Sequence, residues 1–333
     1  MNDSAGGPRV SIIMPVFNDG AFLEEAIASL LAQTEPDFEL VVCDDASSDE
    51  STSIIRRFAG QDARIKALYN DQNRGVCFSR DRAIAVAEGE WITLLDGDDY
   101  YLPERLHELL RFAGACGADM VADGFILVDE NSRETGEVYL PTRRAGQGLE
   151  IEDYVRQGMP SGRRFNPGYL KPMIRRDFIQ SHGITYLPDA WCGQDFVFYL
   201  TCLLHGADWR LMDEAFYCYR KYPRPRTLES KLKRTERHRE NNRHMIALAD
   251  GRQDIVQLLQ KRDRYFDYAV RYQRLSAAAK RVDVTGMLGG LQGGPEYWGF
   301  CLNMLSRRVV NRLQRLLRRP GRTHPKRPRT DID

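Results

Sequence analysis

Closely spaced cysteine pairs are missing from this sequence. The seven cysteines show no CxxC spacing, and most of them stand inside apolar runs: Cys43, Cys77, Cys116, Cys192, Cys202, Cys218 and Cys301. An odd, scattered set of this kind argues against a disulfide framework and is typical of reduced cysteines in the core of a cytosolic protein.

Long apolar runs are also missing. No uninterrupted run approaches the roughly 18–20 residues that a transmembrane helix needs. The opening residues, MNDSAGGPRV, carry neither the basic nor the apolar region of a signal peptide. We therefore expect a cytoplasmic protein, either soluble or peripheral at the inner face of the cytoplasmic membrane.

Net charge is nearly absent from the chain as a whole but not from its end. The 333 residues carry a formal charge of +1. Residues 301–333 hold ten Lys or Arg and two Asp, which gives +8 and leaves −7 for the first 300 residues. This asymmetry predicts an anionic partner for the tail, such as a membrane surface or nucleic acid.

Strand-like and helix-like patterns alternate over the first ~125 residues. We predict strands at residues 10–18, 38–45, 64–70, 90–95 and 118–130, and helices at residues 21–34, around 54–58, 75–87 and 103–114. The alternation predicts an α/β fold with a mostly parallel sheet and helices on both faces. Because ligands bind such sheets beyond the carboxyl ends of the strands, the residues that follow the strands should meet at one rim. They are Phe17, Asn18, Asp44, Asp45, residues 73–75 and residues 96–99.

The pattern is weaker after residue 138. Residues 138–168 indicate loops with one short helix near residues 151–157. A helix is predicted over residues 191–206 and a strand over residues 210–220. Residues 231–284 are helical and highly charged in pattern, and residues 320–333 are expected to be disordered.

Three carboxylates crowd the end of the fourth predicted strand, in EWITLLDGDDYYLP. Asp96 and Asp98 point the same way in an extended chain, because side-chain direction alternates along a strand. A Mn²⁺ or Mg²⁺ ion would offset their repulsion, since Mg²⁺ takes one or two protein carboxylates and completes its shell with water and phosphate oxygens. Taken alone, the cluster could equally be a polar turn, and the spacing of an EF-hand calcium loop is absent.

Four motifs in order make a metal site the better interpretation. They are VSIIMPVFN, FELVVCDDASSD, NRGVCFSRDRAIAVAEGEWITLLDGDD and GQDFVFYL, and together they resemble the inverting glycosyltransferases of family 2, which have the GT-A fold. The resemblance is dense over residues 10–101 and thinner to about residue 220. In VFNDGAFLEEAI and CDDASSDEST the sequence is also similar to enzymes of exopolysaccharide assembly, including the succinoglycan type.

The resemblance implies a domain layout. Residues 1–230 would form the GT-A domain, with a nucleotide-sugar half over about 8–125 and an acceptor half over about 126–230. Residues 231–319 would form a helical C-terminal extension. The activity implied is that of a hexosyltransferase, which transfers a sugar from a UDP-sugar, UDP-glucose or a close relative, to a hydroxyl of a glycan or lipid-linked oligosaccharide acceptor.

The resemblance also implies roles for residues on the donor side. Pro15 and Phe17 stand where this family packs the uracil and ribose. Asp45, with Asp44 beside it, matches the acidic residue that accepts the uracil N3–H, a group that thymine shares. Arg80 matches a basic residue near the nucleotide. Without the family, Asp44 and Asp45 could simply cap the next helix, and Arg80 could be a surface residue.

The remaining roles concern the metal and the proton. Asp96 and Asp98 match the Asp-x-Asp motif that holds Mn²⁺ or Mg²⁺; in the family the second is the firmer ligand and the first lies nearer the ribose. Asp99 matches a third acidic position of lesser role. Asp195 matches the general base, in Gln194-Asp195 where the family often has Glu-Asp; taken alone, it could be an ordinary acid of a helix N-terminus.

Other charged residues have weaker motifs around them. We interpret Lys171 and Arg175 as surface charges, with the diphosphate or the acceptor as the alternative partner. Arg220 could lie on a loop that closes the site. His182 and His205 form no metal pattern, and we interpret them as structural residues.

Residues 297–319 combine an apolar stripe with arginines. The stripe is Leu302, Leu305, Val309, Leu313, Leu316 and Leu317, and Arg307, Arg308, Arg312, Arg315, Arg318 and Arg319 crowd the other positions. We expect an interfacial helix, with residues 297–329 on an anionic membrane surface. A helix packed on the catalytic domain would show the same stripe. Interleaved aromatics are lacking, so nucleic acid is not an expected partner.

Three other function classes remain as alternatives. A phosphotransferase of the haloacid dehalogenase kind also places Asp-x-Asp at a strand end, but normally after the first strand and before Gly-Thr. A nucleotidyltransferase would have a Gly-rich basic loop after its first strand, where this chain has PVFNDGAF. A non-catalytic GT-A-like scaffold that binds membrane through its basic tail would have no need of Asp45, Asp96, Asp98 and Asp195 together.

Overall fold

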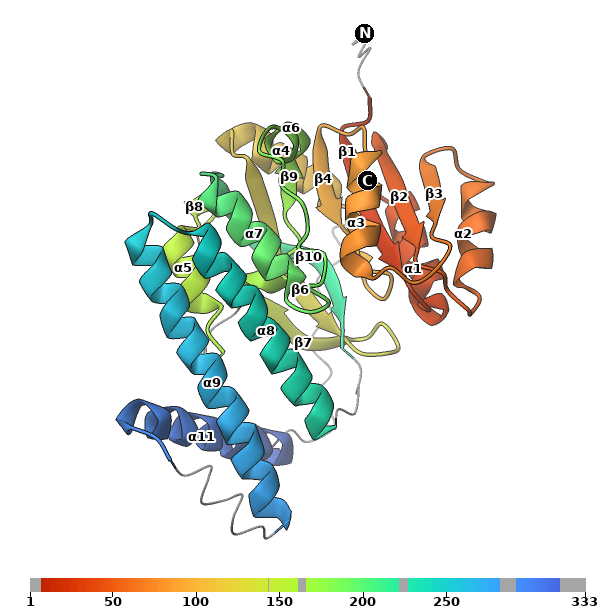
Figure 1. The fold of residues 1–333 in the computed structure, drawn as a ribbon. Helices are drawn as coiled ribbons and strands as arrows, with labels where there is room; N and C mark the ends of the chain where they lie inside the picture. The colour runs from red at the N-terminus through yellow and green to blue at the C-terminus, as the bar shows by residue number, and fades with distance from the viewer. Residues whose placement is uncertain (1–6, 143, 161–165, 222–226, 282–291, 318–333) are drawn as a thin grey trace. The chain divides into compact units, whose positions relative to one another are not determined.

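A computed structural model describes residues 7–142, 144–160, 166–221, 227–281 and 292–317 (Figure 1). The chain divides into two compact units, Met1–Asp267 and Tyr268–Asp333, with the boundary inside the long helix α9. The first unit contains the sheet.

The sheet follows the strand order β3-β2-β1-β4-β9-β6-β10-β5, with β7 on β6 and β8 on β10. The bounds of its strands are β1 (Val10–Val16), β2 (Phe38–Asp44), β3 (Ile65–Tyr69), β4 (Trp91–Leu94), β5 (Tyr100–Tyr101), β6 (Met120–Val128), β7 (Glu134–Tyr139), β8 (Gln147–Gly148), β9 (Met173–Arg175) and β10 (Trp209–Arg220). Strands β3, β2, β1 and β4 are parallel, β9 runs antiparallel to both β4 and β6, and β6 and β10 are parallel.

The predicted strands are confirmed, and the predicted parallel sheet holds for its first four strands. All seven residues of β1 and of β2 are buried, as expected for strands covered on both faces. The sheet then becomes mixed at β9, which the alternation did not predict. Strands β7 and β8 were also missed, because ETGEVY is polar and largely exposed and QG has only two residues.

The order of the strands in the sheet determines where a ligand site is expected. After β3 the chain returns to the other side of β1 to form β4, so β1 and β4 are neighbours at a reversal of strand order. Right-handed crossovers then put α3 (Val76–Ala85) on the face opposite α1 (Gly20–Leu31) and α2 (Ser51–Ala59). Crevices at such reversals, outside the carboxyl ends of the strands, are the usual ligand sites of open α/β sheets.

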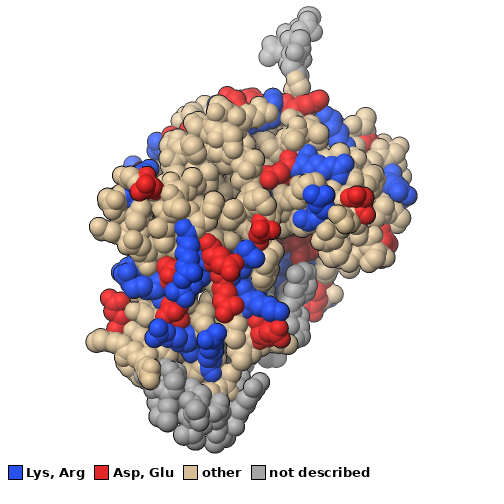
Figure 2. Space-filling model, viewed as in Figure 1, with Lys and Arg blue, Asp and Glu red and all other residues tan. Residues whose placement is uncertain are grey.

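Helices after β4 complete the first unit. They are α4 (Arg105–Cys116), α5 (Ile151–Gln157), α6 (Arg176–Ser181), α7 (Gln194–Leu204), α8 (Leu228–Leu248) and the start of α9 (Gln253–Arg281). The short helix expected at 151–157 is therefore confirmed. Thr227 caps α8, since its side chain accepts from the Ser230 amide. Basic and acidic side chains are interspersed over α8 and α9 on the face in Figure 2, and several are paired, including Arg239 with Asp263.

The second unit contains the end of α9 and α11 (Pro295–Leu317). Aromatic rings hold these two helices together: the Tyr268 ring lies 5.6 Å from Tyr297 and 6.0 Å from Phe300. Leu302 and Leu305 stay 66% and 49% exposed. In the described residues no helix is long and apolar enough to cross a membrane. The disorder expected for residues 320–333 lies outside the described residues.

Candidate active site

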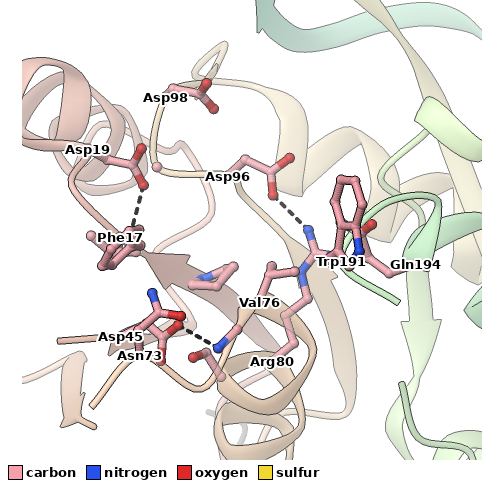
Figure 3. Close-up of a pocket in the computed structure, with 15 residues that line it drawn as sticks. Phe17, Asp19, Asp45, Asn73, Val76, Arg80, Asp96, Asp98, Trp191 and Gln194 are labelled. Atoms are coloured by element: carbon pink, nitrogen blue, oxygen red, sulfur yellow. Dashed lines mark hydrogen bonds and ion pairs between the residues drawn. The ribbon is translucent and has the colours of Figure 1, made fainter. Parts of the chain in front are cut away.

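The carboxyl ends of β1, β2 and β4 surround a cavity of about 490 Å³, the first cavity (Figure 3). In Figure 3, Phe17, Asp45 and Asn73 lie at one end, Trp191 and Gln194 at the other, and Asp96 between them. The predicted convergence of residues after the strands is found in part, because Asn18, Asp44, Arg74 and Asp99 do not line this cavity. Its lining comprises Pro15, Val16, Phe17, Asp19, Asp45, Asn73, Gly75, Val76, Ser79, Arg80, Asp96, Gly97, Asp98, Trp191 and Gln194.

Asp45 is fixed at one wall of the first cavity. Its carboxylate accepts from the backbone N–H groups of Arg74 and Gly75, each at 2.8 Å, and from Asn70 Nδ2 at 2.6 Å. Gly75 has φ +85°, a conformation that glycine adopts without strain and that turns the chain into α3. Phe17 is 47% exposed at the rim, where a flat ring can pack on its face.

Asp44 is not brought into the first cavity. Its Oδ1 accepts from the Ser47 amide at 3.1 Å, and its Oδ2 accepts from Thr52 Oγ1 at 2.5 Å. These bonds fix the loop before α2 and the first turn of that helix. The structure therefore separates the two neighbouring aspartates, and only Asp45 faces a ligand space.

Two buried cations and two partly buried carboxylates alternate around the centre of the site. We name these four residues, Arg80, Asp96, Lys171 and Asp195, the charge tetrad. Arg80 donates to both carboxylates, with Nη2 at 2.8 Å from Asp96 Oδ1 and Nη1 on Asp195 Oδ1. Lys171 Nζ lies 2.8 Å from Asp96 Oδ2 and 2.8 Å from Asp195 Oδ2. Each cation thus serves both anions.

The tetrad keeps its charges because they are paired. Burial would raise the pKa of Asp96, but the charges and hydrogen bonds of Lys171 and Arg80 hold that pKa well below its usual range. For Lys171, burial opposes the charged form, yet Asp195 and Asp96 raise its pKa above the ordinary value.

The interpretation of Lys171 as a surface charge is wrong, and the alternative that Arg80 is a surface residue is excluded. Arg80 is 1% exposed and Lys171 is 5% exposed. Lys171 lies just before β9, in YLKPM, where the apolar neighbours Leu170 and Met173 were the signal for burial. Arg175 is half-buried, and its guanidinium group forms an ion pair with Glu90 at 3.0 Å.

Arg220 also differs from expectation, because it ends β10 and is buried rather than standing on a loop. Its Nε donates to the backbone oxygen of Asp98 at 2.7 Å, and its Nη2 pairs with Glu25 at 2.5 Å. Its backbone N–H donates to Asp99 Oδ1 at 2.7 Å. Arg220 therefore positions the loop that carries the Asp-x-Asp motif.

Asp99 is turned away from the first cavity. It accepts a 2.5 Å hydrogen bond from the Tyr217 hydroxyl, and burial followed by the charges of Asp98 and Asp96 raises its pKa well above the usual range. Of the three aspartates in DGDD, only Asp96 and Asp98 line the first cavity.

The two carboxylates at the first cavity fit a divalent cation that completes its coordination with phosphate oxygens of a bound ligand. Both oxygens of Asp96 are bonded by tetrad cations, so Asp98 is the better placed carboxylate. The described residues form no group of three or more acidic, His or Cys side chains that could hold a metal alone. One or two carboxylates with phosphate oxygens are what Mg²⁺ commonly takes.

A second cavity of about 200 Å³ adjoins the first and shares Asp96, Trp191 and Gln194 with it. Asp195 lines this second cavity and not the first. The full lining is Asp96, Asn166, Gly168, Tyr169, Lys171, Trp191, Cys192, Gly193, Gln194, Asp195, Phe196, Tyr219, Arg234, His238 and Arg262. Exposed rings of Tyr169 and Trp191 suit the apolar face of a sugar ring.

The family model described as glycosyl transferase family 2 matches residues 11–178. The chain belongs to this family. It is 32% identical over 223 residues to the succinoglycan biosynthesis protein ExoU of Rhizobium meliloti, a match that covers 64% of this chain and 62% of that protein. The chain thus spans less than two thirds of this relative's length.

Two solved structures with a similar fold confirm the fold of this chain. TarS 1–349 of S. aureus in complex with UDP-GlcNAc superposes with a TM-score of 0.59 at 18% identity, over 84% of this chain and 89% of that chain. The mannosyltransferase PcManGT of Pyrobaculum calidifontis, in complex with GDP-Man and Mn²⁺, gives 0.56 at 18% identity, over 94% and 90%. The GT-A fold with a helical C-terminal region is therefore the fold of this chain.

Proposed function

We propose that the protein is a metal-dependent inverting glycosyltransferase. It would transfer a sugar from a UDP-sugar, UDP-glucose or a relative, to a hydroxyl of a glycan acceptor in bacterial surface polysaccharide or exopolysaccharide biosynthesis. The observation that carries the proposal is the pair of adjoining cavities. Asp98 lines one and Asp195 lines the other, so leaving group and base have separate places on either side of Asp96.

The nucleoside end of the first cavity suits uracil. Asp45 keeps carboxylate lone pairs at the cavity wall beyond those used by its three donors, since a carboxylate has about four acceptor positions. Uracil presents an N3–H there, whereas cytosine has no hydrogen at N3. Phe17 would pack on the ring, and the related fold of TarS has been solved with UDP-GlcNAc.

Asp98, with Asp96 beside it, would hold Mn²⁺ or Mg²⁺ against the donor diphosphate. A divalent ion there neutralises the charge that grows on the departing UDP. Arg80 and Lys171 would fix the Asp96 carboxylate, so that the wall of the donor site does not move when the ion binds.

Asp195 would take the proton from the attacking hydroxyl. Arg80 and Lys171 orient its carboxylate from two sides, and the second cavity leaves room for the acceptor in front of it. An acceptor that enters through this cavity would meet the anomeric carbon from the side opposite the diphosphate. That single in-line displacement inverts the anomeric centre and needs one base.

We further propose a catalytic domain over residues 1–230 and a peripheral position at the inner face of the cytoplasmic membrane, through residues 297–329. A lipid-linked acceptor would then be within reach. The exposure of Leu302 and Leu305 on α11, beside the arginines of the tail, supports this role. Flotation with vesicles containing anionic lipid tests it, against a Leu302→Gln, Leu305→Gln variant and against neutral vesicles.

Calorimetric titration of UDP tests the donor site. Wild type should bind UDP with Mn²⁺ and lose most affinity with chelator or in Asp98→Asn. Asp62→Asn, a partly buried carboxylate that pairs with Arg64 just before β3, is the matched control and should bind as wild type. Unchanged UDP binding in Asp98→Asn with chelator would remove the metal from the mechanism, and absence of UDP binding would overturn the donor.

A further inference from the structure

Arg262 on α9 is a buried cation that forms no ion pair with an acidic side chain among the described residues. It is 4% exposed, and its guanidinium donates to the backbone oxygen of Gly158 at 3.1 Å and to Asn242 Oδ1 at 3.0 Å. It also stacks at 3.7 Å from the Phe196 ring centroid. Neutral acceptors and rings surround it, and the described part of the chain gives it no ion pair.

Other buried arginines of the same unit are paired. Arg80 has Asp96 and Asp195, Arg105 has Asp123 at 2.8 Å, and Arg220 has Glu25. Burial lowers the pKa of Arg262 to about 9, opposed only by Tyr154. A buried charge without a counter-charge is costly, so its retention in a cavity wall indicates that a ligand brings the opposite charge.

Two more basic side chains on α8 line the same cavity. Arg234 is half-buried over the Trp191 ring at 6.0 Å and forms no ion pair with a described residue. His238 follows one turn later, and burial together with the charges of Arg262 and Arg234 lowers its pKa to about 3. His238 is therefore neutral at pH 7.

The charge balance of the second cavity is positive. The tetrad contributes two cations and two anions, so it is neutral as a group. Arg234 and Arg262 remain without compensation among the described residues. The N-terminus of α7 also lines this cavity: its N-cap residue Gly193 supplies no side-chain cap, and a helix N-terminus attracts anions.

We propose that the second cavity binds an acidic sugar, whose carboxylate or phosphate lies between Arg234 and Arg262 while its ring stacks on Tyr169 or Trp191. The inference deepens the proposed function, on which it rests, by naming the class of acceptor. The donor diphosphate is the other possible source of an anion. Arg234, His238 and Arg262 line only the second cavity, however, while Asp98 lines only the first.

A matched pair of probes tests the proposal. Methyl β-D-glucuronide and methyl β-D-glucoside differ only in a carboxylate against a hydroxymethyl group. Their binding is followed by saturation-transfer NMR on the full chain with Mn²⁺ and UDP, and again without UDP, and glucose 6-phosphate serves as the phosphate probe. An anionic probe should bind roughly tenfold more tightly than the glucoside, because hydrogen bonds to charged groups are the stronger ones.

The variants Arg234→Gln and Arg262→Gln should remove the preference for the anionic probes and leave UDP affinity within about twofold, since charge-assisted bonds are lost only in the second cavity. Arg237→Gln, on the same helix α8 and paired with Glu240, is the control. Should Arg262→Gln fail to fold, the half-buried Arg234 still decides the question.

The outcomes separate the two proposals. Equal binding of glucuronide and glucoside, or a preference that survives in Arg234→Gln, overturns the acidic acceptor. A loss of UDP affinity in these variants, with no preference among the probes, assigns the cations to the diphosphate and also overturns it. Absence of UDP binding in wild type instead overturns the proposed donor, while the probe preference measured without UDP still reports on the second cavity.

Discussion

Lys171 donates to Asp195 across 2.8 Å and from the same nitrogen to Asp96, also at 2.8 Å. The proposed base and the first aspartate of the Asp-x-Asp motif are therefore tied to one ammonium group. Arg80 repeats the connection from the other side. The tetrad thus joins the proposed donor side to the proposed acceptor side through shared ion pairs.

Lys171→Met should lower the free energy of unfolding by about 3–5 kcal/mol, because it removes a buried cation and leaves two partly buried carboxylates to share one. Urea unfolding at pH 7 measures it. The pKa of Asp96 should move up toward the usual range in this variant, since Lys171 is a main cause of its lowering. Lys233→Met, which removes an exposed i,i+4 pair with Glu229, should leave the unfolding midpoint where it is. A loss in Lys171→Met no larger than in the control would contradict a structural role for the tetrad.

Asp99→Asn should change how stability depends on pH. The raised pKa means that the folded protein binds this proton more tightly than the unfolded chain does. The contribution of Asp99 is therefore greatest below the unfolded pKa of about 3.9 and is lost as pH rises through the folded pKa. An asparagine resembles the protonated acid, so the variant should equal wild type near pH 4 and exceed it at pH 7. Urea midpoints across this range measure the difference, and parallel curves would contradict it.

Gly193→Ala should cost more stability than Gly183→Ala. Both glycines have positive φ, +72° and +59°, so each substitution brings backbone strain of about 1 kcal/mol. At Gly183 an added Cβ meets nothing within 4 Å, whereas at Gly193 it would stand 2.4 Å from His238 Nδ1. Thermal unfolding compares the two. In the Gly193→Ala background, His238→Ala should recover part of the loss; equal losses for both glycines would show that His238 moves aside without cost.

Asp45→Asn and Asp44→Asn should separate donor binding from loop stability. Both replace a carboxylate that accepts local hydrogen bonds, so both should lower the free energy of unfolding by about 1–3 kcal/mol. Only Asp45 lines the first cavity, and only its substitution should weaken UDP binding, by roughly tenfold. Calorimetric titration of UDP in the presence of Mn²⁺ measures the affinity of each variant. Equal affinity of the two variants would remove Asp45 from uracil recognition.

The donor half of the site could be predicted because its residues follow strong strand patterns. Asp45 follows β2 and Asp96 and Asp98 follow β4, and a parallel sheet brings such strand ends to one edge. The position of these residues at one edge of the sheet thus follows from the hydrophobic pattern of the strands. Their chemical roles came from the family resemblance.

The second cavity, the proposed acceptor site, could not be predicted in the same way. Lys171 lies in the loop just before the short strand β9, and Arg234 and Arg262 lie on the highly charged helices α8 and α9. In such segments the sequence does not distinguish a basic residue of a site from a basic residue of the surface. What distinguishes Arg262 is that no carboxylate of the described residues forms an ion pair with it, and that depends on packing between α9, α5 and α7. The reversal of strand direction at β9 is likewise set by long-range pairing with β4 and β6 and leaves no local pattern.

Two cations shared between two anions also restrict how this site can change over time. A single substitution that removes a charge at any tetrad position leaves one charge unbalanced in the site, while loss of an opposite pair keeps the group neutral. Variants with a new acceptor should therefore arise by changes around the tetrad, at Arg234, Tyr169 and Trp191, or by paired changes within it. We therefore expect the four charges to change together or to stay together.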